Sequence, residues 1–431
     1  MYQVIALLLA TTQLCSADTL FVAPNTNIDD ILHDAVPGSW IILEAGVHHG
    51  PVITYGYDFV IGSRFLLDSD TSHISETRIV PEDASADTAS CIVYGYGETA
   101  NSRLVGLTLS QGRGTFTDRL GDFAGGLILI QSSSAQIENC RFEDGTAYFG
   151  GACAIASPRG SISNHVVFSN CRFDSCFSSG FGGGVYADQC SVTIDDCYMS
   201  RLEAGPGAGA INMTDGRVFL STTRIESCSG LVGGVMLGDC WGLVRACEFV
   251  SNRCYSWGVC SHFDVYSFIG RIEACEFSLA TSGWPSIGIG GTSSETLFLG
   301  NLVRDNSALI SSGTLVTYDL SQNEVSHNLF LNNQNVYGGT VWAFQNSNAI
   351  VHHNTFTNNS SLNPESGSVI QTMSFGRPDV SENIIAGNSG QTISAYYQYP
   401  VRIDARNNWW GHESGPYHPT LNPTGQGDTL L

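Results

Sequence analysis

The sequence predicts an all-β solenoid of about a dozen three-sided coils, and three observations lead to that prediction. The first is a recurring pattern: an apolar residue, two variable positions, Asn or Cys, one variable position and usually another apolar residue. Its fourth position, which is Thr in one weaker copy, falls at residues 140, 171, 197, 223, 247, 275, 301, 328, 354 and 383. A period in this range is typical of a solenoid, in which each repeat buries its apolar face by stacking on its neighbours.

The other two observations are glycine-led strands and a composition suited to turns. Short apolar strands that begin with glycine recur at Gly125–Leu129, Gly150–Ala154, Gly183–Tyr186, Gly233–Met236 and Gly338–Trp342. The chain has 48 glycines and only 13% charged residues, which fits many tight turns and argues against long helices. Strands of three to five residues separated by Gly, Asn and Ser predict a coil with three sides.

Within one copy of the repeat, the strand period assigns each position to a side. Alternation places Val192 and Ile194 inward and Thr193 outward. A buried Asn stacked on another Asn can pass amide hydrogen bonds along the axis, and Cys fills a similar volume without needing partners. The position just before the Asn or Cys is expected on the outer face of a turn.

Residues 1–17 are expected to be a secretory signal. The apolar run Met1–Ala10 is too short to cross a bilayer, and Cys15-Ser16-Ala17 offers a small-residue cleavage site. This predicts a secreted or cell-surface protein whose mature chain has no transmembrane segment. Of the other 13 cysteines, Cys140, Cys171 and Cys197 share one register in consecutive repeats, and Cys247 and Cys275 do so again. We expect mostly free, stacked thiols, although one or two bridges would also fit.

The charge excludes some partners. The formal charge is −22, and all 18 basic residues are arginine. Such a surface repels nucleic acid and anionic membranes, so we expect no nucleic-acid partner. A polyanionic ligand would need locally clustered arginines or divalent cations. We expect a monomer.

Taken in order, the chain divides into the signal, a cap, the column of coils and a closing segment. In the N-terminal cap, residues 18–38, Ile28, Ile31 and Leu32 have the spacing of a helical turn. Segments 68–76 and 111–122 are expected to project from the column as loops. In the C-terminal segment, residues 409–431, Trp409-Trp410 is expected to cover the last open strand edge.

These features resemble the single-stranded right-handed parallel β-helix of the pectin-lyase-like superfamily. The paired Gly-Gly-aliphatic and Phe-x-x-Asn pieces, as in Phe330–Asn333, are similar to repeats of polymorphic outer-membrane autotransporter passengers. Segments Asp58–Leu66 and Ala405–Pro419 are similar to parts of secreted bacterial β-helix proteins of unassigned function. The resemblance implies a β-helix over residues 39–408. It implies no single activity, because the superfamily holds lyases, hydrolases, esterases, epimerases and non-catalytic adhesins.

The sequence contains no complete catalytic motif of that superfamily. Arg377-Pro378-Asp379 is similar to the lyase arginine motif but lacks its second arginine. Asp195-Asp196 is the one piece similar to the clustered aspartates of the hydrolases. Two esterase-like pieces, Asp58–Gly62 and Gly376–Pro378, lie more than 300 residues apart, which is the wrong arrangement for neighbouring coils.

One candidate site follows from the register. His327, His353 and Glu382 occupy the position before Asn in consecutive coils, and His352 is adjacent. At a strand spacing of about 4.8 Å, two imidazoles and a carboxylate could share a metal ion or a proton. The alternative is a set of solvated turn positions that accept any polar residue, as Asn139 does.

Three weaker candidates remain. Asp195 and Asp196 could act as a carboxylate pair for glycosidic cleavage or form a solvated acidic turn. The acidic segments 68–70 and 82–87 make calcium the one cofactor considered, although they lack the spacing of a calcium loop. Aromatic residues that could stack on sugar rings, or belong to the core or caps, are Tyr198, Tyr255, Trp257, Trp284, Tyr396, Tyr397 and Tyr399.

The leading functional hypothesis is a secreted or cell-surface protein that binds carbohydrate or another surface along the column without catalysis. The alternative is a polysaccharide lyase or glycoside hydrolase whose site is scattered over several coils. A groove walled by segment 111–122, with arginine and acidic residues converging, would favour the enzyme. A smooth face with an aromatic stripe would favour binding.

Overall fold

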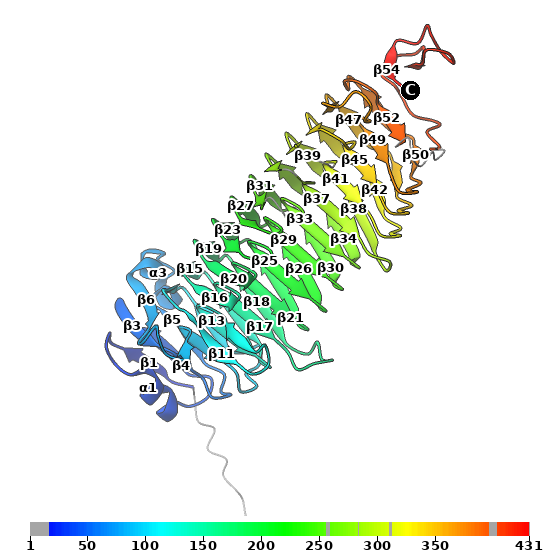
Figure 1. Cartoon of the computed structure of the whole chain (residues 1–431). Coiled ribbons are helices and arrows are strands. Elements are labelled where there is room, and N and C mark those ends of the chain that lie inside the picture. Colours follow the sequence, from blue (N-terminus) through cyan, green and yellow to red (C-terminus); the bar gives the residue numbers. More distant parts are fainter. Residues whose placement is uncertain (1–16, 256–258, 283, 310–312, 396–402, 431) are drawn as a thin grey trace, which may run out of the picture.

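The computed structural model describes residues 17–255, 259–282, 284–309, 313–395 and 403–430, which wind into a long column of parallel strands (Figure 1). Three sheets run along the column. Sheet A has 14 strands, from β1 (Thr19–Val22) to β50 (Asp379–Ser381); sheet B has 13, from β3 (Gly46–Gly50) to β51 (Ile384–Ala386); and sheet C has 13, from β4 (Val52–Ile53) to β52 (Ile393–Ala395). The predicted all-β solenoid of about a dozen coils is confirmed.

Each coil visits sheets A, B and C in turn, and each strand pairs with its equivalent one coil away. One coil contains β22 (Ser191–Asp195) in sheet A, β23 (Tyr198–Ser200) in sheet B and β25 (Ile211–Thr214) in sheet C. Val192 and Ile194 are buried and Thr193 is partly exposed, as the strand period predicts. The core therefore runs along the axis as stacked layers of like side chains.

A one-residue turn connects sheet A to sheet B. Asp196, His327, His353 and Glu382 occupy this turn in four coils, with φ of 51°, 59°, 55° and 57°. A single left-handed residue redirects the chain and points the next side chain inward, and Asn, Asp and His tolerate this conformation better than most residues. The predicted outward position is confirmed.

The inward residue after this turn forms a ladder of buried amides in the C-terminal half. Asn354 Nδ2 donates to the Val325 carbonyl at 2.8 Å and to Asn383 Oδ1 at 3.0 Å. Asn354 Oδ1 accepts from the backbone N–H and Nδ2 of Asn328, both at 2.9 Å. Each amide is thus satisfied by its neighbours, as predicted. A second ladder, five residues further along each coil, consists of Asn306, Asn333, Asn359 and Asn388.

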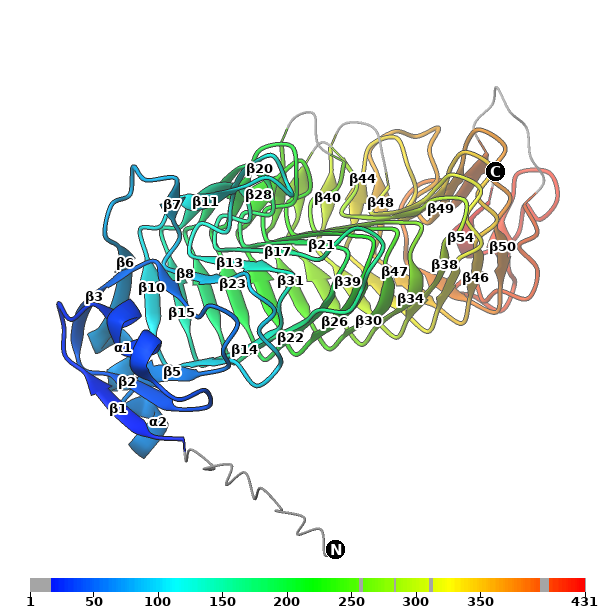
Figure 2. The same cartoon turned by 90° about the horizontal axis from the view of Figure 1, so that it is seen from below.

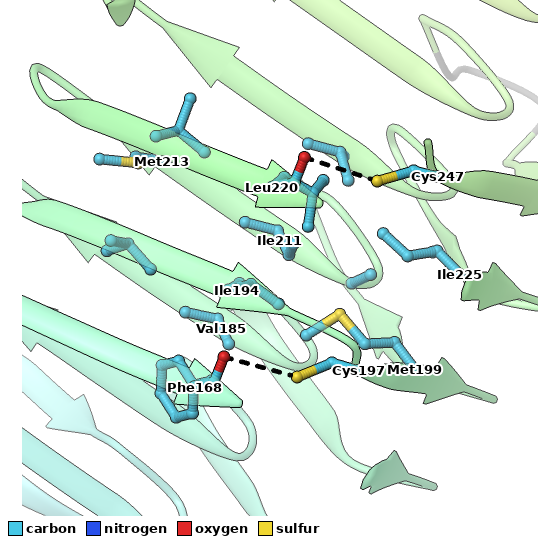
Figure 3. Close-up of a cluster of buried hydrophobic side chains, with 14 of the residues drawn as sticks. Phe168, Val185, Ile194, Cys197, Met199, Ile211, Met213, Leu220, Ile225 and Cys247 are labelled. Atoms are coloured by element: carbon cyan, nitrogen blue, oxygen red, sulfur yellow. Dashed lines mark hydrogen bonds between the residues drawn. The ribbon is translucent and has the colours of Figure 1, made fainter. Parts of the chain in front are cut away.

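Cysteine takes the same inward position in the N-terminal half, where its thiol reaches an equivalent carbonyl. Cys197 Sγ donates to the Phe168 carbonyl at 3.7 Å, and Cys247 Sγ to the Leu220 carbonyl at 3.6 Å (Figure 3). The 13 cysteines in the described part of the chain are all free and buried, as expected. Burial raises the pKa of the Cys140 thiol to about 12, which disfavours the reactive thiolate.

A buried histidine bridges a break in the second ladder. Ala280 occupies the ladder position between Asn252 and Asn306 and has no side-chain amide. The ring of His262 fills this gap. Asn252 Nδ2 lies 3.2 Å from His262 Nδ1, and His262 Nε2 lies 3.2 Å from Asn306 Oδ1. Because the Asn306 oxygen can only accept, Nε2 carries the hydrogen and Nδ1 accepts from Asn252. The ring is neutral, and its burial lowers the pKa of His262 to about 4.

Asp264 lies two residues further along, in β33 (Phe263–Tyr266), and is also buried. Its Oδ1 accepts from the Tyr318 hydroxyl at 2.9 Å. Burial raises the pKa of Asp264 to about 6, because the low dielectric of the site disfavours the carboxylate. His262 and Asp264 therefore have pKa values displaced in opposite directions.

The N-terminal end of the column is covered by helix α1 (Ile28–Asp34), with Ile28 and Leu32 buried as predicted. Asn27 caps this helix by accepting from the Asp29 N–H. β1, in the expected cap region, already pairs with β2 (Trp40–Leu43) in sheet A. None of the helices in the described ranges is long and apolar enough to cross a membrane.

The C-terminal end is closed by residues of the expected closing segment. Asp428, in β54 (Gly427–Thr429), accepts from the backbone N–H groups of Gly387 and Asn388 and from Asn388 Nδ2, at 2.9 to 3.0 Å. Trp410 is 7% exposed and packs on the last coil, whereas Trp409 is 48% exposed. The pair was expected to act together, but only Trp410 covers the core.

The two expected loops contain regular structure, so that prediction is wrong. Segment 68–76 holds all of helix α3 (Ser72–Glu76) and the last residue of α2 (Phe65–Asp68). The side chains of Asp68 and Asp70 accept from backbone N–H groups two residues on and connect the helices. Segment 111–122 contains β11 (Gly114–Thr117), which pairs antiparallel with β12 (Asp122–Ala124).

This hairpin belongs to a fourth sheet, sheet D, on one side of the column (Figure 2). Its other strands are β7 (Thr88–Ala89), β16 (Thr146–Phe149), β20 (Phe177–Phe181), β24 (Glu203–Ala204), β28 (Ser229–Gly230) and β32 (Arg253–Cys254). Further along lies a four-stranded sheet of β36 (Thr281–Ser282), β40 (Ser307–Ala308), β44 (Gln334–Asn335) and β48 (Ser360–Ser361).

The first prediction concerns the Asp428 cap. In Asp428→Ala, two backbone N–H groups and the Asn388 amide lose their acceptor, which costs about 1–3 kcal/mol for each group left unsatisfied. We expect faster amide hydrogen exchange at Gly387 and Asn388. Asp428→Asn repeats the ladder unit and should stay close to wild type. Equal exchange in the two variants would contradict the assignment.

The second prediction concerns pH. As pH falls from 6.5 to 4, the unfolded chain protonates its histidine before His262, which removes about 3 kcal/mol of stability. Over about the same range folded Asp264 takes up a proton that the unfolded chain does not, which adds about 3 kcal/mol. The two effects offset each other in the wild type. Asp264→Asn should therefore lose stability steeply on acidification, and His262→Gln should gain it.

Urea unfolding midpoints between pH 4 and pH 7 measure these slopes for the wild type and both variants. Each variant is compared with itself across pH, so that a uniform loss of stability from the substitution does not affect the result. Parallel curves for all three proteins would show that neither group titrates in the folded state as described.

Candidate functional site

Sheet D presents alternate side chains to the core and to solvent. Ala124, Phe149 and Phe181 face inward and pack with an apolar cluster on the outer side of sheet C. Phe123 and Tyr148, beside Ala124 and Phe149 in the same strands, consequently face outward. The register between β16 and β20 shifts between Ala147 and Phe149, which lets Phe177 face outward in the same strand as Phe181. Packing on sheet C holds these strands in place and so fixes the outer face of sheet D.

An open cleft of about 340 Å³ lies on this outer face. The hairpin β11–β12, strand β16 and strand β20 supply its walls. Arg113 Nη1 donates to Thr146 Oγ1 at 3.2 Å, which positions the guanidinium, and Phe177 is 41% exposed. The lining residues are Arg113, Asp122, Phe123, Thr146, Ala147, Tyr148, Phe177 and Ser179.

The lining combines apolar faces with hydrogen-bonding groups. Phe123, Tyr148 and Phe177 offer aromatic surface, while Arg113 donates hydrogen bonds and Asp122 accepts them. A sugar ring has apolar C–H faces and a rim of hydroxyls, so this mixture suits a carbohydrate better than a purely apolar ligand. Arg113 and Asp122 of segment 111–122 line the cleft, which is the arrangement expected of the enzymatic alternative.

The same outer face continues along the axis. Glu203 in β24 is paired with Phe177 of β20, and its Oε1 accepts from the Tyr255 hydroxyl at 2.7 Å. Partial burial and the hydrogen bond to Glu203 raise the pKa of Tyr255 to about 12, so that the phenol stays a donor. The cleft thus opens onto a polar strip formed by Glu203 and Tyr255.

Two carboxylates on this face, Asp122 and Glu203, are too far apart to form a hydrolytic pair. Asp122 and Glu203 are separated by three strand steps, from β12 through β16 and β20 to β24, which corresponds to roughly 14 Å. Glycosidases place their two carboxyl groups roughly 5 to 9.5 Å apart. Asp122 and Glu203 therefore lack this catalytic spacing.

The structure also brings together the histidine cluster that the register predicts. The rings of His327 and His353 are stacked, with centroids 5.1 Å apart and planes 3° apart, and His353 Nε2 lies 3.0 Å from Glu382 Oε2. His352 lies closer to the other cluster residues than its register implies. Its Nδ1 lies 2.7 Å from His353 Nδ1, and its Nε2 lies 3.2 Å from Glu324 Oε1. Among the described residues, no three His, Cys, Asp or Glu side chains gather around one metal position.

Asp195 and Asp196 occupy the end of β22 and the following one-residue turn. Asp195 Oδ1 accepts from Ser221 Oγ at 2.6 Å, and Asp196 is exposed. These contacts match a solvated acidic turn, and a binding role for the two residues stays a prediction. The acidic segments considered for calcium bond to themselves, since Asp83 accepts from the N–H and hydroxyl of Ser85. Calcium binding also stays a prediction.

Of the aromatic residues considered for sugar stacking, Tyr255 belongs to the polar strip beside the cleft and Tyr198 is engaged elsewhere. The guanidinium of Arg172 lies 4.8 Å from the Tyr198 ring centroid, and the Tyr198 hydroxyl donates to Glu226. Trp284 is partly buried. Four others, Trp257, Tyr396, Tyr397 and Tyr399, lie outside the described residues.

The aromatic residues that line the cleft were missed in the sequence. Phe123, Tyr148 and Phe177 stand outside the repeated pattern, and each neighbours an apolar residue that resembles core. The available signal is alternation within residues 146–149, Thr-Ala-Tyr-Phe, where the two aromatic residues must face opposite sides of one strand.

Comparison with known proteins supports the fold. Residues 233–409 match the family model described as right handed beta helix region. A search of curated protein sequences finds no match.

Similar solved structures have low sequence identity to this chain. The surface adhesin PfbA of Streptococcus pneumoniae is 11% identical, with 86% of each chain covered and a TM-score of 0.43. A double mutant of the periplasmic alginate epimerase AlgG is 10% identical, with 90% of this chain and 83% of that chain covered and a TM-score of 0.42. The A-module of the mannuronan C-5 epimerase AlgE6 of Azotobacter vinelandii is 12% identical, with 88% and 92% covered and a TM-score of 0.37.

The family match covers coils whose three parallel sheets continue without a break to the N-terminal end of the column. The chain is therefore a right-handed parallel β-helix.

Proposed function

We propose that this protein is a secreted or cell-surface glycan-binding protein that holds its ligand in the cleft on sheet D. The observation that carries the proposal is the lining of that cleft. Phe123, Tyr148 and Phe177 supply apolar faces for sugar rings, and Arg113 and Asp122 supply a donor and an acceptor for hydroxyls.

The rigidity of the site supports binding. Sheet D is anchored on sheet C through inward side chains such as Phe149 and Phe181, so the outward aromatic residues need little ordering when a ligand arrives. Association loses less conformational entropy on a preformed surface. A repetitive glycan chain also suits a repetitive column, because neighbouring strands present similar hydrogen-bonding positions.

A lyase or hydrolase is the second candidate, and the presence of Arg113 and Asp122 in one cleft favours it. Hydrolysis is less well supported, because Asp122 and Glu203 are too far apart for the usual carboxylate pair. An assay for binding must therefore also measure cleavage. Reducing ends report hydrolysis, and unsaturated ends report elimination.

The third prediction tests the cleft. In Phe177→Ala and Tyr148→Ala, the loss of one stacking face should weaken glycan binding about tenfold or more, since burying an aromatic side chain contributes about 1.5–3 kcal/mol. Phe219→Ala is the matched control, because Phe219 is 45% exposed on sheet A, away from the cleft. A panel of neutral and acidic polysaccharides identifies the ligand by affinity electrophoresis, and calorimetry then measures affinity.

The same panel is assayed for new reducing and unsaturated ends, with and without calcium. Retention of a polysaccharide without new ends is the expected result. Equal affinity of Phe177→Ala, Tyr148→Ala and the Phe219→Ala control would contradict binding at the cleft, and catalytic release of new ends would replace it with the enzymatic alternative.

A further inference from the structure

In the histidine cluster near the C-terminal end of the column, His352 and His353 contact each other through their Nδ1 atoms. His352 ends β46 (Ile350–His352), and His353 is the one-residue turn that follows. Their Nδ1 atoms lie 2.7 Å apart. Two nitrogen lone pairs repel at this distance, so either a hydrogen on one Nδ1 or a metal ion must lie between them.

The other ring nitrogens fix the number of protons. His352 Nε2 faces the Glu324 carboxylate at 3.2 Å, and His353 Nε2 faces the Glu382 carboxylate at 3.0 Å. An ionised carboxylate only accepts hydrogen bonds, so both Nε2 atoms carry hydrogen. Without a metal, one further proton is shared between the Nδ1 atoms. The pair then carries one positive charge between two carboxylates.

We propose that His352 and His353 form a binding site for a divalent transition-metal ion held between their Nδ1 atoms. The ion takes the place of the shared proton, which leaves to solvent, and no electron is transferred. A metal-bound imidazole commonly donates its other N–H to a carboxylate, which orients the ring and makes it a stronger ligand. Glu324 and Glu382 already make this contact with each ring.

The distance between the nitrogens selects the kind of metal ion. Two metal–nitrogen bonds of about 2.0 Å that meet at a right angle separate the nitrogens by about 2.8 Å, whereas a tetrahedral angle separates them by about 3.3 Å. The Nδ1 atoms of the metal-free pair lie 2.7 Å apart, so they need to move least to reach the right angle, which is the geometry of Cu²⁺ and Ni²⁺ sites. Calcium prefers oxygen ligands and does not fit.

The surroundings leave room for an open site. The side chains of His352 and His353 are 24% and 47% exposed, so that water can complete the coordination. This two-nitrogen arrangement differs from a closed site of three or more protein ligands. The His327 ring stacks on the His353 ring in parallel, with centroids 5.1 Å apart. We therefore assign His327 to holding the His353 ring in place and not to binding the ion.

Titration of the metal-free protein with Cu²⁺ alone tests the site. We expect one tight ion per chain, with two imidazole nitrogens coupled to copper in pulsed electron paramagnetic resonance spectra. His352→Ala or His353→Asn should remove one of these nitrogens and weaken binding at least tenfold. Asn is well tolerated in the left-handed turn, so His353→Asn preserves the fold. Glu382→Gln should weaken binding about 10- to 100-fold through the orientation of His353.

Two variants serve as controls. His327→Phe keeps a ring stacked on His353 but has no nitrogen, so affinity should remain that of the wild type. His33→Gln removes an exposed histidine of helix α1 and should have no effect. The proposal is overturned if the double variant His352→Ala/His353→Asn binds Cu²⁺ as tightly as the wild type, or if the spectra show a single coordinated imidazole. The site is independent of the glycan cleft, so Phe177→Ala should bind Cu²⁺ normally.

Discussion

The one-residue left-handed turn between sheets A and B is the constraint on which the rest of the structure depends. It places the following residue inside the column, next to a backbone N–H and to a carbonyl of the preceding coil that no strand partner reaches. A buried unpaired group of this kind costs about 1–3 kcal/mol. The inward side chain must therefore be small enough to fit and able to hydrogen-bond, as Asn354 and Cys197 are.

Asparagine and cysteine meet this requirement differently, and the column is built differently in its two halves. Asparagine gives each coil strong bonds in both directions. The first ladder ends at Asn408 and the second at Asp428. Cysteine has one weak donor, which lies 3.6 Å from the carbonyl of the preceding coil and 3.2 Å from a carbonyl of its own coil in Cys247, so the cysteine-rich half needs stabilisation from elsewhere. Part of it comes from sheet D, whose inward residues bury apolar surface on sheet C. Sheet D therefore both adds this stability and forms the outer face in which the cleft lies.

The sequence predicts the structural features that repeat from coil to coil and misses those that occur only once. The strand period and the inward Asn or Cys position predicted the sheets, the buried ladder and the outward turn positions, because these recur in every coil. The hairpin β11–β12 occurs once and was taken for a loop, although Thr115 and Thr117 alternate with Phe116. Phe177 and Tyr148 were missed because each stands beside an apolar residue, Cys176 or Phe149, and neither belongs to the repeated pattern that separates inward from outward positions.

The histidine cluster shows where a register argument ends. His327 and His353 occupy left-handed turns, and histidine is enriched in that conformation for backbone reasons alone. Their stacking follows from the coil spacing and needs no function. His352 is different, because it ends a strand and has no such preference. Its Nδ1 meets that of His353 only because both Nε2 atoms are drawn to carboxylates on separate coils, Glu324 and Glu382. The contacts among these four side chains, which come from three coils, thus hold the two Nδ1 atoms together. Solvated turn positions would not need such contacts.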